Sequence, residues 1–132
     1  MRVAGRAVLL VFGVVVLVAA IVWRWQPEPI GGAMRIPELS AEAQAGKRAF
    51  GLFCAHCHGE HAGGSVAGPP LVHPTYRPAH HADVAFELAV RRGVRAHHWR
   101  FGDMRPDPTV SPVDIAQITR YVRELQRANG IE

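Results

Sequence analysis

The sequence is poor in three features, and each shortage excludes a class of protein. Once the three arginines flanking the first apolar run are set aside, 12 basic residues face 11 acidic ones from Pro27 onward. A nearly neutral domain lacks the concentrated basic surface that nucleic acid requires, so no nucleic-acid partner is expected. No segment alternates apolar and polar residues as a half-buried strand does, which indicates an all-α chain. Nothing pairs a nucleophile with a base, or two carboxylates for acid–base chemistry, so we expect no catalytic residue, no enzyme and no small-molecule substrate.

One long apolar run is present, at the N-terminus. Residues 7–23, AVLLVFGVVVLVAAIVW, carry no charge, follow Arg2 and Arg6, and are just long enough for a helix that spans a bilayer. Arginines before the run favour a cytoplasmic N-terminus, so 1–25 is predicted to anchor the chain in the cytoplasmic membrane with its domain in the periplasm or otherwise outside. The alternative is a signal peptide cleaved after 18–20, although the apolar run continues past that point. Both interpretations export the domain.

Residues 26–39 are expected to form a linker, and 40–132 a helical domain. The linker contains three prolines and two glycines and has no usable periodicity. In the domain, Ser40 and Ser111 stand where helix N-caps are expected. Apolar residues recur at helical spacing in three segments: 41–53, 83–92 and 112–128. Three short helices with long loops bury little apolar surface, so an apolar group is expected to fill the middle.

The only two cysteines stand three apart, in CAHCH at residues 54–58. On a helical turn Cys54, Cys57 and His58 project to one side, so two thiols can add to one haem while the imidazole reaches its iron. This pattern predicts one haem c, attached through Cys54 and Cys57, with His58 as an iron ligand. A thioredoxin-like dithiol would need a βαβ context, and a zinc site would need histidines at finger spacing. A plain disulfide leaves His58 unexplained.

Four stretches, GKRAFGLFCAHCHG, GPPL, GDM and ITRYVRELQ, resemble a mono-haem class I cytochrome c of membrane-anchored bacterial type over residues 40–128. The resemblance implies a small cytochrome c fold, with three main helices and long loops around one covalently bound haem. An N-terminal transmembrane helix would precede it. The resemblance also implies that the carbonyl of Pro69 accepts the Nδ1 hydrogen of His58, which fixes the imidazole.

The same resemblance explains why a glycine occupies position 46. It lies on the same side of the first helix as Phe50, where glycine costs about 1 kcal/mol relative to alanine. In the resembled family the first and last helices cross. Gly46 and Phe50 would then meet Tyr121 and Leu125.

Iron bound to His58 needs a sixth ligand or keeps an open position. Met104 is favoured, because it lies in the turn-rich segment GDMRPDP, where no helical stripe explains a methionine. A neutral thioether stabilises Fe(II) and raises the reduction potential, which suits an electron carrier. His97 and His98 are the main competitors. The further candidates are the histidines His61, His73, His80 and His81. In the resembled family proline commonly follows the methionine, whereas here Arg105 intervenes.

These residues predict electron transfer by a covalently bound haem with His58 and Met104 as axial ligands. Single electrons would pass between respiratory-chain or dehydrogenase and oxidase partners at the outer face of the cytoplasmic membrane. Redox proteins are the expected partners, and residues 7–23 the attachment to the membrane. Two alternatives stay open: a fixed haem subunit of a larger membrane oxidoreductase complex, and a ligand-binding or peroxidatic haem protein with an open sixth position.

Overall fold

The computed structural model describes residues 15–18, which are helical, and residues 34–132. Most of the membrane segment expected over 7–23, and the linker up to residue 33, lie outside the described residues. Within the described part of the chain, no helix has the length and apolar character needed to cross a membrane. Residues 34–132 form one compact unit.

Three main helices build this unit, and local chemistry sets their ends. Helix α2, Ala41–Phe53, begins at Ser40, whose Oγ accepts a hydrogen bond from the Ala43 amide at 3.2 Å. Helix α5, Pro112–Ala128, begins in the same way at Ser111. Helix α4, Asp83–Arg92, ends at Gly93, which has a φ of 74°. The predicted helices over 41–53, 83–92 and 112–128 are confirmed, and 34–132 contains no strand, only an isolated bridge.

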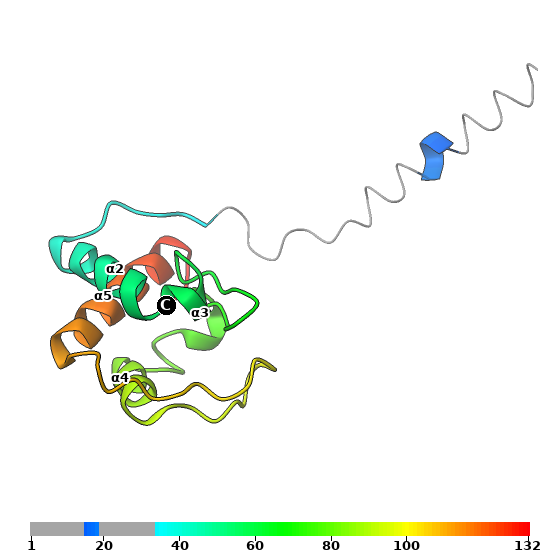
Figure 1. Cartoon of the computed structure of the whole chain (residues 1–132). Helices are drawn as coiled ribbons and strands as arrows, with labels where there is room; N and C mark the ends of the chain where they lie inside the picture. Colours follow the sequence, from blue (N-terminus) through cyan, green and yellow to red (C-terminus); the bar gives the residue numbers. More distant parts are fainter. Residues whose placement is uncertain (1–14, 19–33) are drawn as a thin grey trace, which may run out of the picture. The chain divides into compact units, whose positions relative to one another are not determined.

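Helices α2 and α5 pack against each other, and α4 packs on α5 (Figure 1). The crossing is closest at Gly46, where an added Cβ would lie 1.9 Å from the carbonyl oxygen of Gln117. One turn further along α2, the rings of Phe50 and Tyr121 meet edge to face with centroids 5.5 Å apart. The expected crossing is therefore confirmed for Phe50 and Tyr121. The nearest neighbour of Gly46 is the backbone of Gln117, one turn before Tyr121 in α5.

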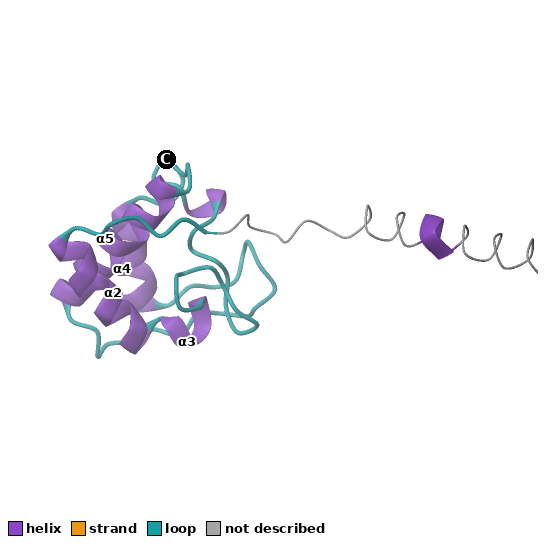
Figure 2. Ribbon diagram, turned by 90° about the horizontal axis from the view of Figure 1, so that it is seen from above, coloured by secondary structure: helices purple, strands orange, loops and turns teal. Residues whose placement is uncertain are grey.

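Long loops join the helices (Figure 2). The short helix α3, Ala55–His58, follows α2 directly, and a single 3₁₀ turn, η1, spans Pro74–Tyr76. The chain ahead of α2 is held to the C-terminus, since the Arg35 amide donates to Asn129 Oδ1 and Asn129 Nδ2 donates to the Arg35 carbonyl, both at 2.9 Å. Residues 34–39, which the sequence placed in the linker 26–39, thus contact the C-terminal end of the domain.

Candidate functional site

The cysteine pair and its histidine lie on one helical turn at the end of α2. The Cys54 amide donates to the Phe50 carbonyl at 2.9 Å, which continues the helical path into α3. Within the turn, the amides of Cys57 and His58 both donate to the Cys54 carbonyl, at 3.1 and 2.9 Å. A residue and its i+3 and i+4 neighbours share one helix face; of the three, Cys54 and His58 line the cavity described below, whereas Cys57 is exposed and is not part of its wall. The two cysteines are free thiols and form no disulfide.

His58 is oriented by the loop that follows the motif. Its Nδ1 donates to the carbonyl oxygen of Pro69 at 2.8 Å, the hydrogen bond that the resemblance implies. A proton on Nδ1 leaves the lone pair of Nε2 free for a metal. Burial lowers the pKa of His58 below its ordinary 6.5, although the hydrogen bond to Pro69 offsets part of this shift. The loop lies close behind the motif, because a Cβ on Gly68 would lie 2.8 Å from the Cys57 carbonyl.

A cavity of about 380 Å³ opens beside this turn. Cys54, His58 and Met104 all line it, together with the Pro69 loop. Its wall is mostly apolar and aromatic, and the members that the motif did not point to include Leu71, Tyr76, Phe86, Val90, Trp99 and Phe101. A cavity of this character suits a ligand that is itself largely apolar. It has room for the apolar group that three short helices are expected to need.

Met104 is held at the cavity by backbone pairing. It forms an isolated antiparallel bridge with Val94, in which each amide donates to the other's carbonyl, at 2.9 and 3.0 Å. Gly93 makes room for this bridge, since a Cβ there would lie 2.6 Å from the Met104 carbonyl and 3.0 Å from Pro106 Cδ. The Asp107 amide also donates to the Val90 carbonyl at 2.8 Å, which ties the far side of the segment to α4. The Met104 side chain packs partly buried against the core.

The structure narrows the set of competing histidines. His81, His97 and His98 line the cavity, whereas the wall does not include His61, His73 or His80. His97 and His98 are exposed, in contrast to the partly buried Met104. His73 is occupied elsewhere: its ring packs on Trp99 with centroids 4.9 Å apart.

The thiols do not have the character of a reactive dithiol or a zinc site. Burial, with smaller contributions from Asp107 and Cys57, raises the pKa of Cys54 to about 11. A nucleophilic or redox-active cysteine has a lowered pKa, because its thiolate is the reacting form. In the part of the chain that the structure describes, no histidine or carboxylate group gathers with Cys54 and Cys57 around one metal-sized position.

These residues fit a covalently attached haem: two free thiols on one turn, an imidazole whose Nδ1 is held by Pro69 so that its Nε2 is free, and an apolar cavity beside them. The site therefore defines a c-type haem protein. Residues 43–126 match the model of the Cytochrome c family, and the chain belongs to that family. The family implies haem c and haem-based electron transfer with redox protein partners. No curated protein and no solved structure shows significant similarity to the chain.

Two features of the site were not predicted from the sequence. The first feature is the pairing of Val94 with Met104. The two residues lie ten apart, and no strand pattern around them indicates that they pair. The second is the aromatic wall provided by Trp99 and Tyr76, where the Trp99 Nε1 donates to the Tyr76 hydroxyl at 3.1 Å. The only sequence signal for either is Gly93, which ends α4 and is followed at once by an apolar residue.

Proposed function

We propose that this chain carries single electrons on one haem c, attached through Cys54 and Cys57, with His58 and Met104 as axial ligands. The observation that carries the proposal is that Cys54, His58 and Met104 all line one apolar cavity. Bound there, the haem supplies an iron that alternates between Fe(III) and Fe(II).

The chain's own residues set the properties of that iron. His58 offers a neutral imidazole whose ring is held by the Pro69 carbonyl, so its Nε2 is available without loss of a proton. Met104 offers a neutral, soft thioether, which favours Fe(II) and raises the reduction potential relative to a second imidazole. The apolar wall adds to this preference, because a low-dielectric surrounding disfavours the more highly charged oxidised iron. With two protein ligands on the iron, no position is left for a substrate, and we propose a carrier rather than an enzyme.

We further propose that residues 7–23 hold the domain at the outer face of the cytoplasmic membrane, where it meets redox protein partners. The support is the uncharged run and the arginines before it. Fractionation of cells that express the full chain tests the anchor: recovery with the membrane, released by detergent and not by salt, is expected. An N-terminus that begins after residue 20 in the mature protein overturns it.

The ligand assignment is tested by absorption spectra of the haem-loaded protein. We expect low-spin iron, a sulfur-to-iron charge-transfer band when oxidised, and no rapid binding of carbon monoxide when reduced. Met104→Ala should abolish the band and open the iron to carbon monoxide, whereas Met34→Leu should leave both unchanged. High-spin iron in the wild type would instead support the ligand-binding or peroxidatic alternative. An unchanged spectrum in Met104→Ala, with a change in His97→Gln or His98→Gln, would assign the ligand to that histidine.

The choice between a mobile carrier and a fixed subunit has its own test. Purification from membranes in mild detergent should give the chain free of stoichiometric partners. Co-migration with one stable partner through two different columns would favour the fixed haem subunit of a larger oxidoreductase.

A further inference from the structure

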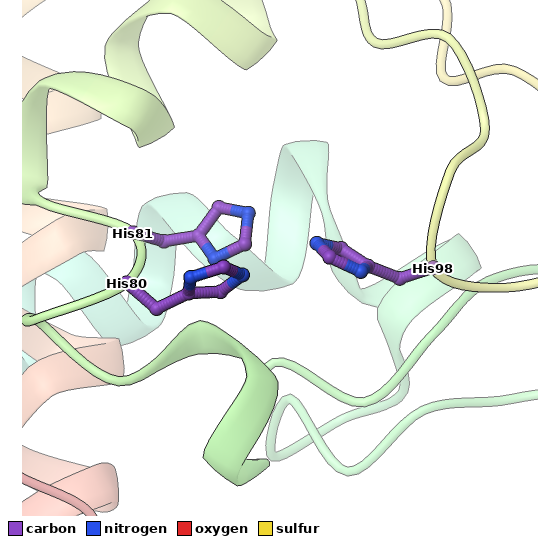
Figure 3. Close-up of side chains that lie close together, drawn as sticks. All are labelled: His80, His81 and His98. Carbon is purple, nitrogen blue, oxygen red and sulfur yellow. The ribbon is translucent and has the colours of Figure 1, made fainter.

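Three histidines from two separate loops meet beside the cavity. His80 and His81 lie just before α4, and His98 lies in the loop between Val94 and Met104. Figure 3 shows the rings of His80 and His81 projecting toward the ring of His98. One ring nitrogen from each lies within 4.8 Å of those from the other two. Electron transfer by the haem does not require this arrangement.

The three rings form a closed triangle. Their centroids lie 4.6 Å apart for His80 and His81, 5.2 Å for His81 and His98, and 5.5 Å for His80 and His98. A fourth imidazole, that of His97, lies 4.1 Å from His98. Among the described residues no Asp or Glu belongs to this group. Protonation of all the rings would therefore crowd positive charges together, whereas a bound cation needs them neutral.

His81 is already oriented as metal-binding histidines are. Its Nδ1 donates to the carbonyl of Thr75 at 2.8 Å, so its Nε2 carries the free lone pair. Its backbone is held as well, because Arg123 Nη2 donates to the His81 carbonyl. Arg123 is itself buried, with 7% of its side chain exposed. His81, one corner of the triangle, is thus held in place by the buried part of the domain.

The other two histidines are free to close around an ion. His80 and His98 are exposed, and within the described part of the chain no hydrogen bond involves their ring nitrogens. Three nitrogens about 2.0–2.1 Å from a tetrahedral ion lie about 3.3 Å from one another, so small side-chain rotations suffice.

We propose that His80, His81 and His98 bind one divalent transition-metal ion of the kind that prefers imidazole, Zn²⁺ or Cu²⁺. Three histidines leave a fourth position for water or for His97. Binding needs only these side chains and does not depend on the electron-transfer role. One consequence does rest on the proposed function: His81 and His98 also line the haem cavity, so the added positive charge stabilises reduced iron and raises the reduction potential.

The test uses the haem-loaded domain with no histidine tag, titrated calorimetrically with Zn²⁺, which is redox-inert. One equivalent is expected to bind, with an affinity that His81→Gln and His98→Gln each lower at least about ten-fold. His56→Gln is the matched control, because His56 is exposed and lies between the two cysteines, apart from the triangle. X-ray absorption at the zinc edge should show three imidazole ligands. Unchanged circular dichroism of the helices in all variants establishes that they are folded.

Two results would overturn the proposal: no stoichiometric binding at micromolar protein, or binding that both His81→Gln and His98→Gln retain. The second result would place the ion on other histidines. Failure of the proposed function is seen separately, since the charge-transfer band and the carbon monoxide test are recorded without zinc. A domain that binds zinc at the triangle but lacks that band would keep this inference and lose the assignment of Met104.

Discussion

Val94 and Met104 hold each other by two backbone hydrogen bonds, one from each amide to the other's carbonyl. The bridge closes the loop of residues 95–103, which carries His98 and part of the aromatic wall. Asp103 reinforces the loop from inside, since its Oδ1 accepts a hydrogen bond from the Ala96 amide at 2.8 Å. A weak ligand such as a thioether depends on a backbone that holds it in place. In the proposed ligation, the backbone pairing of Met104 itself thus compensates for the Arg105 that stands where proline is expected.

Gly93→Ala should loosen the loop of residues 95–103, which the bridge between Val94 and Met104 closes. The added Cβ would lie 2.6 Å from the Met104 carbonyl, and Gly93 has a φ of 74°, which costs a non-glycine residue about 1–2 kcal/mol. We expect the sulfur-to-iron band to disappear at a lower temperature than in the wild type. Thermal titration of that band in the oxidised protein measures the effect.

Gly102→Ala is the matched control for Gly93. Gly102 also has a positive φ, of 88°, and lies in the same loop, but an added Cβ would have nothing within 4 Å. It should show the backbone cost alone, with a smaller shift of the band. Equal shifts in the two variants would mean that the contact with Met104 has no role in ligation.

Gly46→Ala should disrupt the crossing of α2 and α5. Its Cβ would meet the Gln117 carbonyl oxygen at 1.9 Å, and neither helix backbone can give way cheaply. Overpacking of this kind costs about 3 kcal/mol of the free energy of unfolding. Gly51→Ala in the same helix meets nothing within 4 Å and should stabilise the domain by up to about 1 kcal/mol. Urea unfolding of the two variants, followed by circular dichroism of the helices, measures both effects. Similar midpoints for Gly46→Ala and Gly51→Ala would contradict the close approach of α2 and α5 at Gly46.

The helices and the haem-attachment turn could be predicted because their causes are local. Ser40 and Ser111 act on amides three residues away, and CAHCH needs only one turn of helix to present its side chains together. The role of Gly46 needed more than its own helix, since a glycine there is simply unfavourable until a partner helix is known. The resemblance supplied the partner helix, and the structure shows that the backbone of Gln117 lies nearest to Gly46.

The bridge at Met104 and the histidine triangle could not be predicted, because each joins segments that only the folded chain brings together. The sequence placed Met104 in a turn-rich segment but did not indicate which residue pairs with it. It presented His80–His81 and His97–His98 as two unconnected pairs. Arg123 could not be predicted either: within α5 it stands beside apolar residues, and the two carbonyls that it binds, those of Tyr76 and His81, lie 47 and 42 residues earlier.

Arg123→Leu should destabilise the domain through the loop ahead of α4. Arg123 Nη1 donates to the Tyr76 carbonyl at 2.8 Å, and Nη2 donates to the His81 carbonyl. Loss of the guanidinium leaves the His81 carbonyl unpaired and removes one of two donors to the Tyr76 carbonyl, which Gln126 Nε2 also reaches at 3.0 Å, at a cost of about 1–3 kcal/mol. Asp83→Asn is the control: Asp83 accepts from Arg123 Nε at 2.7 Å but is 73% exposed, so the change should cost under about 1 kcal/mol. Equal losses in chemical unfolding would show that the ion pair matters and the carbonyls do not.

Glu124 should make the attachment of α2 to α5 dependent on pH. Its carboxylate accepts from the amide and the hydroxyl of Ser40, at 3.0 and 2.8 Å, and from Arg120 Nε at 2.8 Å. Burial alone would raise the pKa of Glu124, but these hydrogen bonds hold it below its ordinary 4.5. A carboxyl with a lowered pKa in the fold stabilises it fully above the unfolded value, and the stabilisation is lost as pH falls through the folded value.

Glu124→Gln should therefore be less stable than the wild type at neutral pH, by about 1–2 kcal/mol, because charged acceptors make the stronger hydrogen bonds. The difference should shrink as the pH is lowered below 4.5 and vanish once Glu124 is protonated in the fold. Urea unfolding of both proteins across this range measures it. Glu38→Gln, which changes an exposed carboxylate ahead of α2, should follow the wild type throughout. If the free energies of unfolding of wild type and Glu124→Gln differed by the same amount at every pH, the charge of Glu124 would not be what stabilises the contact between the two helices.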